Sequence, residues 1–197
     1  MKKKIILVFM VFCIYSCNRK DSIFIKEIIS DEMVTITPIL KKGSSKDSVA
    51  IVIPMEFEIK TNNSSLKSID FYVVINQKIL MQITEYEIYD KKNKNKPIND
   101  LDAYLSSDKS FNIIIKEKKH LISVKDAMKI LSKYKKDNKL LYNLKFGDTI
   151  KIEPYSQFRK NNPIFLNELR KIGDTLIITT RKKNEKIYIP KKNKINW

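Results

Sequence analysis

The nine residues 51–59, which read IVIPMEFEI, decide the fold class of this chain. Apolar side chains recur there at every second position, the period of a β-strand: Ile51, Ile53, Met55, Phe57 and Ile59. Glu56 and Glu58 occupy alternate positions between them. The stretch therefore predicts a strand with one face in a hydrophobic core and the other face in solvent.

Further strands are predicted on either side of this stretch. Residues 69–75 alternate in the same way and follow the polar turn 61–65, so we expect them to form an antiparallel pair with 51–59. Residues 33–40 predict another strand, and 79–89 predict one or two more. The strand spacing between residues 31 and 90 resembles an immunoglobulin-like β-sandwich, without the cysteine and tryptophan landmarks of antibody domains.

The second half of the chain mixes helices with strands. Ser123 and Asp126 form a capping-box pattern at the start of an amphipathic segment that reaches about residue 138. A second helix is predicted from Asn162-Pro163 to Ile172, where Gly173 stands at the position of a C-terminal glycine. Short strands are expected at 111–115, 150–152, 176–180 and 187–189. The predicted fold class is α+β with β dominant. A sandwich-like region over 31–118 precedes a smaller mixed α/β region over 119–197, and we also consider that the two pack as one domain.

The first sixteen residues have the layout of a secretory signal peptide. Three lysines at positions 2–4 precede the apolar run 5–15, which is too short to span a bilayer. The run ends in Ile14-Tyr15-Ser16-Cys17. This ending resembles the lipobox of a bacterial lipoprotein precursor, in which an aliphatic and a small residue precede the cysteine. The resemblance implies cleavage after residue 16 and acylation of Cys17, whose chains would then hold the protein in a lipid bilayer.

Two alternatives to acylation at Cys17 are open. Cys13 lies within the apolar run after the bulky Phe12, which does not fit the lipobox, and an ordinary signal peptide followed by a chance cysteine is the other reading. We expect residues 17–30 to be the lipidated cysteine and its tether. Asn18, rather than Asp, follows the cysteine, which favours the outer membrane of the cell envelope. Lys20-Asp21 is similar to the charged export tag of surface lipoproteins in Bacteroidota.

Composition limits the chemistry of the mature chain. Cys13 and Cys17 are the only cysteines, so a disulfide or a thiolate metal site within residues 17–197 is excluded. The whole chain has 39 basic and 22 acidic residues, and loss of the three leader lysines lowers the net charge from +17 to +14. This charge favours an anionic glycan or a protein as partner. Only four of the basic residues are arginine, and the leader implies export, so we expect no nucleic-acid partner.

The sequence contains no recognisable catalytic motif. His120 is the only histidine, and we interpret it as an ordinary surface or turn residue. The pairs Glu56/Glu58 and Glu85/Glu87 could in principle hydrolyse glycosides, but we interpret them as solvated strand faces. The repeated Gly-Asp-Thr at 147–149 and 173–175 is interpreted as turn chemistry. No catalytic residue, cofactor or metal ligand is assigned.

The sequence therefore predicts a lipid-anchored envelope protein that acts as a non-catalytic binding or assembly module. One alternative is an immunity lipoprotein that neutralises a secreted toxin. Another is an envelope hydrolase that uses acidic residues, which a cleft holding two carboxylates about 5–10 Å apart would favour.

Overall fold

The computed structural model describes residues 23–39, 47–61, 66–107, 110–118, 120–145 and 147–197. The expected signal peptide, Cys17 and the residues up to 22 lie outside the described ranges. The strands are β1 (Ile23–Ile28), β2 (Met33–Thr37), β3 (Ser48–Val52), β4 (Pro54–Thr61), β5 (Leu66–Ile75), β6 (Lys78–Ile79), β7 (Tyr86–Asp90), β8 (Ser110–Glu117), β9 (Leu121–Ser123), β10 (Ile150–Pro154), β11 (Thr175–Lys182) and β12 (Ile189–Lys194). The helices are α2 (Asp102–Ser107), α3 (Val124–Lys133), α4 (Lys139–Tyr142), α5 (Tyr155–Asn161) and α6 (Pro163–Ile172).

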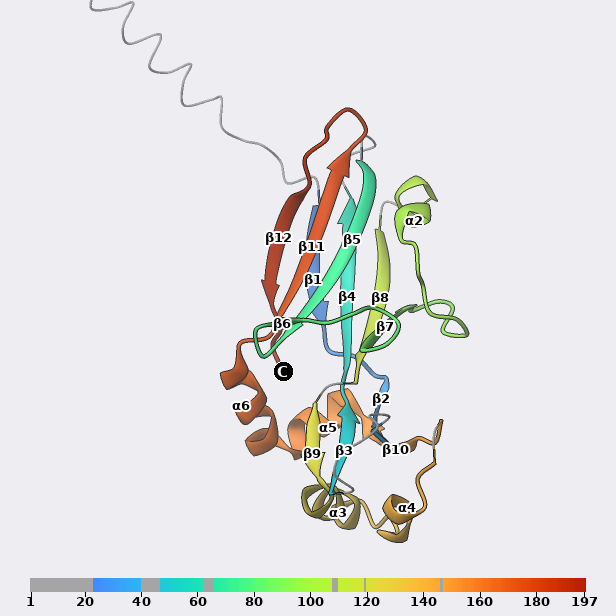
Figure 1. Ribbon diagram of the computed structural model, residues 1–197, viewed down its shortest axis with the longest axis vertical. Helices are drawn as coiled ribbons and strands as arrows, with labels where there is room; N and C mark the ends of the chain where they lie inside the picture. Colours follow the sequence, from blue (N-terminus) through green and yellow to red (C-terminus); the bar gives the residue numbers. More distant parts are fainter. Residues whose placement is uncertain (1–22, 40–46, 62–65, 108–109, 119, 146) are drawn as a thin grey trace, which may run out of the picture.

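Three antiparallel sheets carry the fold, which confirms the β-dominant α+β class (Figure 1). Sheet A has the order β1-β4-β8-β7, and sheet B has the order β10-β2-β3-β9. The chain crosses between these two sheets: β3 in sheet B ends at Val52, and β4 in sheet A begins at Pro54, with only Ile53 between them. Pro54 opens β4, and because proline has no backbone N–H to donate, it suits the point where the ladder changes sheets.

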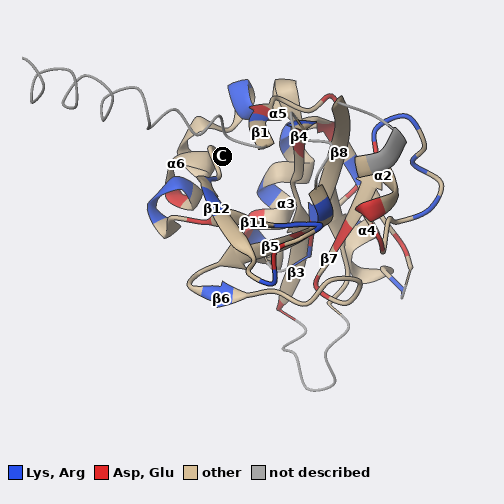
Figure 2. Ribbon diagram, turned by 90° about the horizontal axis from the view of Figure 1, so that it is seen from above, with Lys and Arg blue, Asp and Glu red and all other residues tan. Residues whose placement is uncertain are grey.

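Sheet C, with the order β12-β11-β5-β6, lies against sheet A (Figures 1 and 2). The Tyr86 hydroxyl on β7 donates a 2.8 Å hydrogen bond to the Phe71 carbonyl on β5, which joins the two sheets. Their inner faces contribute to one hydrophobic core, in which Phe57, Ile88 and Ile178 are almost completely buried. Sheets B and C each combine strands from 31–118 with strands from 119–197.

The expected pairing of 51–59 with 69–75 is wrong. β4 pairs with β1 and β8 in sheet A, while β5 pairs with β11 and β6 in sheet C. The reason is burial: most of β4 is buried on both faces, so it lies in the interior of a sheet and takes a neighbour on each edge. A strand of that kind satisfies its hydrogen bonds with partners that are distant in the sequence, and the adjacent β5 is free to enter the facing sheet.

The two principal helices begin where the sequence predicts them, but α3 ends at Lys133, about five residues before its expected end, because the chain leaves the helix at Lys135 with φ 54°. Ser123 caps α3 by accepting a 3.0 Å hydrogen bond from the Asp126 backbone N–H. Pro163 opens α6, and Gly173 ends it in the left-handed conformation with φ 75°. Helix α5 was not predicted. The strand expected at 187–189 is also wrong, since β12 begins only at Ile189 and the preceding residues form the end of a hairpin.

Candidate functional site

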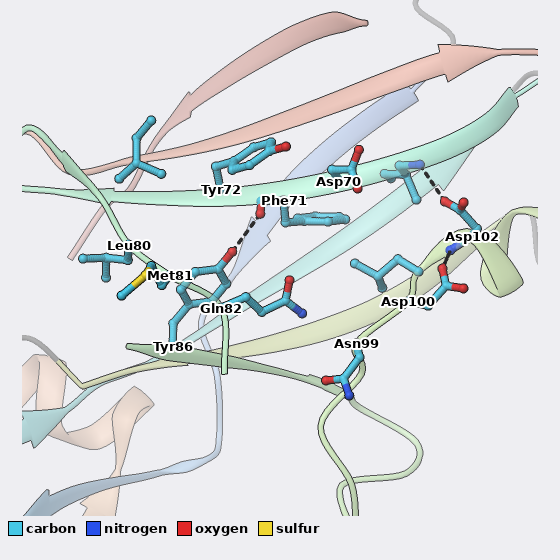
Figure 3. Close-up of a pocket in the computed structure, with 13 residues that line it drawn as sticks. Asp70, Phe71, Tyr72, Leu80, Met81, Gln82, Tyr86, Asn99, Asp100 and Asp102 are labelled. Atoms are coloured by element: carbon cyan, nitrogen blue, oxygen red, sulfur yellow. Dashed lines mark hydrogen bonds between the residues drawn. The ribbon is translucent and has the colours of Figure 1, made fainter. Parts of the chain in front are cut away.

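A pocket of about 440 Å³ opens beside β5, between β6 and the segment that leads into α2 (Figure 3). Its wall on one side is β5, and its other sides come from residues 79–82, Tyr86 and residues 99–102. Three carboxylates line it: Asp70, Asp100 and Asp102. We call this the acidic pocket. It brings together residues that are up to 33 positions apart in the sequence, from Ile69 to Asp102.

Backbone hydrogen bonds fix two of the three carboxylates. Asp102 accepts a 2.9 Å bond from the backbone N–H of Ile69 on β5, which ties α2 to the edge of sheet C. Asp100 in turn accepts a 2.8 Å bond from the Asp102 backbone N–H. Figure 3 shows both interactions at one side of the pocket. These two acids therefore hold the wall in place through one carboxylate oxygen each.

Asp70 differs from its neighbours. It projects from β5, is partly buried, and accepts no hydrogen bond from any residue that the structure describes. Burial raises the pKa of its carboxyl above the ordinary value, and repulsion from Asp102 and Asp100 adds to this although Arg181 opposes it. A cation that entered the pocket would relieve this repulsion.

The floor and rim of the pocket are apolar and aromatic. Tyr86 lies beneath, with its hydroxyl on the Phe71 carbonyl, and burial raises the pKa of Tyr86 to about 12, so it remains a neutral donor. Tyr72, Ile79 and Met81 are exposed at the rim, and Met81 is 64% exposed. An exposed rim of this kind adds apolar contact to whatever the carboxylates bind.

The chain that carries this rim is held in a strained conformation. Asn76, Gln77 and Ile83 all have positive φ, and the value of 74° at Ile83 is rare for a β-branched residue. Its backbone N–H donates a 2.7 Å bond to the Tyr86 carbonyl, and the side chain is 56% exposed. Backbone strain tends to be retained where a surface has a function. Ile83 thus extends the exposed apolar surface next to the pocket.

A second group of acids is buried, and it corrects our interpretation of His120 as a surface or turn residue. His120 is only 6% exposed. Its Nδ1 bonds to the Glu117 carboxylate, and its Nε2 lies 3.4 Å from the Asp174 carboxylate. The C-terminal Trp197 packs edge-on against the imidazole and donates a 2.9 Å bond from Nε1 to Asp174. These four residues are the buried histidine cluster.

Electrostatics in this cluster favour the charged histidine. Burial lowers the pKa of His120, but the hydrogen bonds and charges of Asp174 and Glu117 outweigh it and raise the pKa to about 9. Burial by itself would raise the pKa of Asp174. Its interactions with His120, the Asn76 N–H and Trp197 outweigh burial and bring the pKa below the ordinary value. The cluster thus joins the β8–β9 connection, the start of β11 and the C-terminus. With all four side chains buried, it has a structural role.

The two glutamate pairs singled out in the sequence do not come together as a site. Glu56 is 4% exposed, not solvated as expected, and it binds Lys91 Nζ at 2.8 Å and the Ser30 hydroxyl at 3.0 Å. Its carboxylate is buried because Ser30, which follows β1, and Lys91, which follows β7, contact it. Glu87 pairs with Lys118 at 2.9 Å, and Glu85 accepts a bond from the Met81 backbone N–H. None of these residues lines the acidic pocket.

Both Gly-Asp-Thr repeats act as turns. Gly147 and Gly173 have φ of 88° and 75°, a region that favours glycine. Asp148 accepts a bond from the Lys145 backbone N–H, and Asp174 accepts one from the Asn76 backbone N–H. The turn interpretation is confirmed at 147–149, where Asp148 caps the turn. At 173–175 only Gly173 acts in this way, because Asp174 bonds to distant residues and belongs to the buried histidine cluster.

Outside these two sites, neither the distribution of charge alone nor a group of metal-ligating side chains indicates a further site in the part of the chain that the structure describes. Basic residues are spread around the fold, including α3, α6 and β6, and do not form a single stripe (Figure 2). Within the described ranges there is no group of three or more histidine, cysteine, aspartate or glutamate side chains arranged to hold a metal ion. The helices in the same ranges are each too short or too polar to cross a membrane.

Comparison with known proteins adds no relative. No protein-family model matches the chain, and no curated protein or solved structure is significantly similar to it.

The sequence did not predict the acidic pocket or the buried histidine cluster, because their residues have no distinguishing local pattern. Asp70 alternates with apolar residues like any solvated strand residue, and Asp100 and Asp102 lie in a polar stretch. The available signal was compositional: four aspartates lie within residues 70–102 of a lysine-rich chain, and three of them line the pocket. For the buried cluster, the signal was the unusual tryptophan at the C-terminus.

Proposed function

We propose that this protein is a lipid-anchored component of the cell envelope and that it binds a partner protein without catalysis, through the acidic pocket. The observation that carries this proposal is the pocket itself. On a chain with net charge +17, three aspartates and an exposed apolar rim surround one open cavity. A lysine or arginine side chain with neighbouring apolar residues is the group that complements such a surface.

A protein partner is favoured over an anionic glycan at this site. Carboxylates repel the charged groups of an anionic glycan, whereas they attract a cationic side chain. The exposed Ile79, Met81 and Ile83 also extend beyond the cavity and suit an apolar protein surface. An immunity lipoprotein that binds a basic toxin is one form of this proposal.

The anchor rests on the leader. The lipobox-like Ile14-Tyr15-Ser16-Cys17 supports acylation at Cys17, and Asn18 supports the outer membrane. Labelling cells with a fatty-acid probe should mark the wild type and not Cys17→Ala, while Cys13→Ala keeps the label. Equal labelling of the wild type and Cys17→Ala would overturn the anchor. The contact between sheets A and C supports a sandwich of the immunoglobulin-like type as the scaffold that presents the pocket.

Peptide binding tests the pocket. The acylated full chain in detergent would be titrated by calorimetry with a short amidated peptide that alternates leucine with lysine, and with a matched peptide in which glutamate replaces lysine. We expect only the basic peptide to bind, with an affinity that falls as salt is added because exposed charges are screened. Equal binding of the two peptides, or binding of neither, would contradict the proposal.

An acid-dependent hydrolase is the second candidate, and one specific observation favours it. Burial raises the pKa of Asp70, which lies beside two other carboxylates, and carboxyl groups in unlike environments are the arrangement from which an acid and a base are drawn in hydrolases. Envelope glycans with a fluorogenic leaving group would reveal it. Turnover that disappears in Asp70→Asn and in Asp100→Asn would support the enzyme, whereas no turnover in the wild type leaves binding as the activity of the pocket.

A further inference from the structure

The hairpin that joins β11 to β12 ends in residues 181–189, which we call the basic tip. The last residue pair of β11 with β12 is Thr180 with Ile189, and Arg181 and Lys182 still pair with β5, so residues 183–188 lie past the ladders of sheet C. Figure 1 shows the tip at the same end of the molecule as the start of β1. The tip therefore forms one extremity of the described fold.

The basic tip combines exposed apolar side chains with lysines. Ile187 is 75% exposed, and the adjacent Tyr188 and Ile189 are each close to half exposed. The tip has four basic residues against the single acid Glu185: Arg181, Lys182, Lys183 and Lys186. Exposure of isoleucine to water is unfavourable. Three consecutive exposed apolar residues at an extremity of the fold therefore indicate a site that contacts another surface, outside this domain.

The Tyr188 ring is held in position at the tip. The Arg181 guanidinium lies 5.2 Å from the centre of the ring, in a cation–π arrangement. Tyrosine is enriched at the level of lipid headgroups, where its apolar ring and polar hydroxyl match the boundary between hydrocarbon and water. Lysine side chains next to it place their charges among anionic headgroups while their methylene stems remain in apolar surroundings.

The position of the tip relative to the chain start identifies the surface that it contacts. Lys191 on β12 donates a 3.1 Å hydrogen bond from Nζ to the Ile23 carbonyl, so the hairpin and the first residue of β1 are adjacent. Cys17 precedes Ile23 by six residues, which span at most ~20 Å when fully extended. From Lys191 the hairpin continues four residues to Ile187, or ~13 Å at the rise of a strand. An anchor at Cys17 thus keeps the tip within reach of the bilayer.

We propose that the basic tip inserts Ile187 and Tyr188 into the headgroup region of the anionic bilayer that carries the anchor. The inference rests on the proposed acylation of Cys17. Together the anchor and the tip hold the domain at two points, so that its long axis stands away from the membrane. Helices α3 and α4, at the opposite end in Figure 1, then face away from the bilayer.

Site-specific fluorescence tests this orientation. The acylated full chain carrying Ile187→Cys would be labelled with an environment-sensitive maleimide, because the thiol of Cys17 is blocked by its lipid. Tyr142→Cys, on α4 and 72% exposed, is the matched control at the opposite end. Both proteins would be reconstituted in phosphatidylcholine vesicles containing phosphatidylglycerol and a lipid-borne nitroxide quencher, and vesicle flotation would be recorded in parallel.

We expect strong quenching and a blue-shifted emission at position 187 and neither at position 142. Adding Lys183→Glu and Lys186→Glu to the labelled protein should remove most of the quenching but leave flotation intact, whereas Lys125→Glu with Lys129→Glu on α3 should change neither. Flotation without quenching at position 187 would overturn the tip and leave the anchor standing. Loss of flotation in the unmodified chain would overturn the anchor, and the two-point attachment with it.

Discussion

The acidic pocket and the buried histidine cluster use the same residue type in opposite ways. Asp174 is buried and satisfied, with hydrogen bonds from Trp197 and the Asn76 backbone and with the His120 imidazole 3.4 Å away as an ion-pair partner. Asp70 is partly buried and accepts no hydrogen bond from the described residues. Their carboxyl pKa values accordingly move in opposite directions, with that of Asp174 lowered and that of Asp70 raised.

The difference between the two sites separates stability from binding. A buried carboxylate is tolerated only when the fold supplies its partners, so removal of one member leaves the others unpaired. A partly exposed carboxylate without a partner contributes little to folding and is available to a ligand. We therefore expect substitutions in the buried cluster to lower the free energy of unfolding, and substitutions in the pocket to change binding alone.

The largest effect is expected from Asp174→Ala. It leaves the charged His120 and the Trp197 indole N–H without their common acceptor in the core, which should lower the free energy of unfolding by about 3–5 kcal/mol. Urea denaturation followed by tryptophan fluorescence measures it. Glu168→Ala, which breaks an exposed pair with Lys171, is the control and should cost less than about 1 kcal/mol. Equal losses in the two variants would remove the distinction between the sites.

The pH dependence of stability is the next largest effect. The folded pKa of His120 is about 9, against an ordinary value of 6.5, so the folded state binds the proton more tightly. The resulting stabilisation, of order 3 kcal/mol, is complete below pH 6.5 and is lost as the pH rises through about 9. Denaturation midpoints between pH 6 and pH 10 should fall in the wild type.

His120→Gln is the matched variant for this pH series. It should start less stable at pH 6 and show a much flatter profile across the same range, because the titrating group is gone. A wild-type midpoint that stays constant from pH 6 to pH 10 would show that His120 is not held in its charged form.

Asp70→Asn should act on binding and spare the fold. Loss of one exposed charge partner is expected to weaken the basic peptide about fivefold, which corresponds to roughly 1 kcal/mol. Stability should stay within about 0.5 kcal/mol of the wild type, because a carboxyl that is repelled by its neighbours is replaced by a neutral amide. The exposed Asp137→Asn at the opposite end is the control, and an equal loss of affinity there would rule out a local effect of Asp70.

The smallest effect is expected from Met81→Ala. The side chain is 64% exposed at the pocket rim and contributes little to the core, so the unfolding free energy should remain within about 0.5 kcal/mol. Binding of the leucine-lysine peptide should weaken by about twofold, since part of the apolar contact is lost. If the peptide bound Met81→Ala with unchanged affinity, Met81 would not be part of the binding site, and the carboxylates alone would account for binding.

Local patterns in this chain were predictable, and long-range pairings were not. The α3 cap at Ser123, the glycine at the end of α6 and the alternation in β5 depend on neighbours within a few residues, and the structure confirms them. The partner of β4 was wrong because both edges of a buried strand are satisfied by distant segments, here β1 and β8. Sequence spacing cannot rank such pairings.

The candidate sites were hidden for the same reason. His120 meets Asp174 and Trp197 only because β8–β9, β11 and the C-terminus converge, although the three lie up to 77 positions apart, from His120 to Trp197. Asp70 meets Asp102 through the bond that α2 makes to the Ile69 N–H. A single histidine and scattered aspartates have no local signature that separates a buried cluster from a solvated surface.

The most direct test of the account follows methionine methyl groups during a titration. The chain holds Met33, Met55, Met81 and Met128 after the leader, and only Met81 lines the acidic pocket. With carbon-13-labelled methionine methyls, the leucine-lysine peptide should shift the Met81 resonance progressively and leave the resonance of the buried Met55 and the Trp197 indole signal unchanged. A peptide that binds without moving the Met81 resonance, or that shifts Met55 and Trp197 instead, would contradict the assignment of the acidic pocket as the binding site.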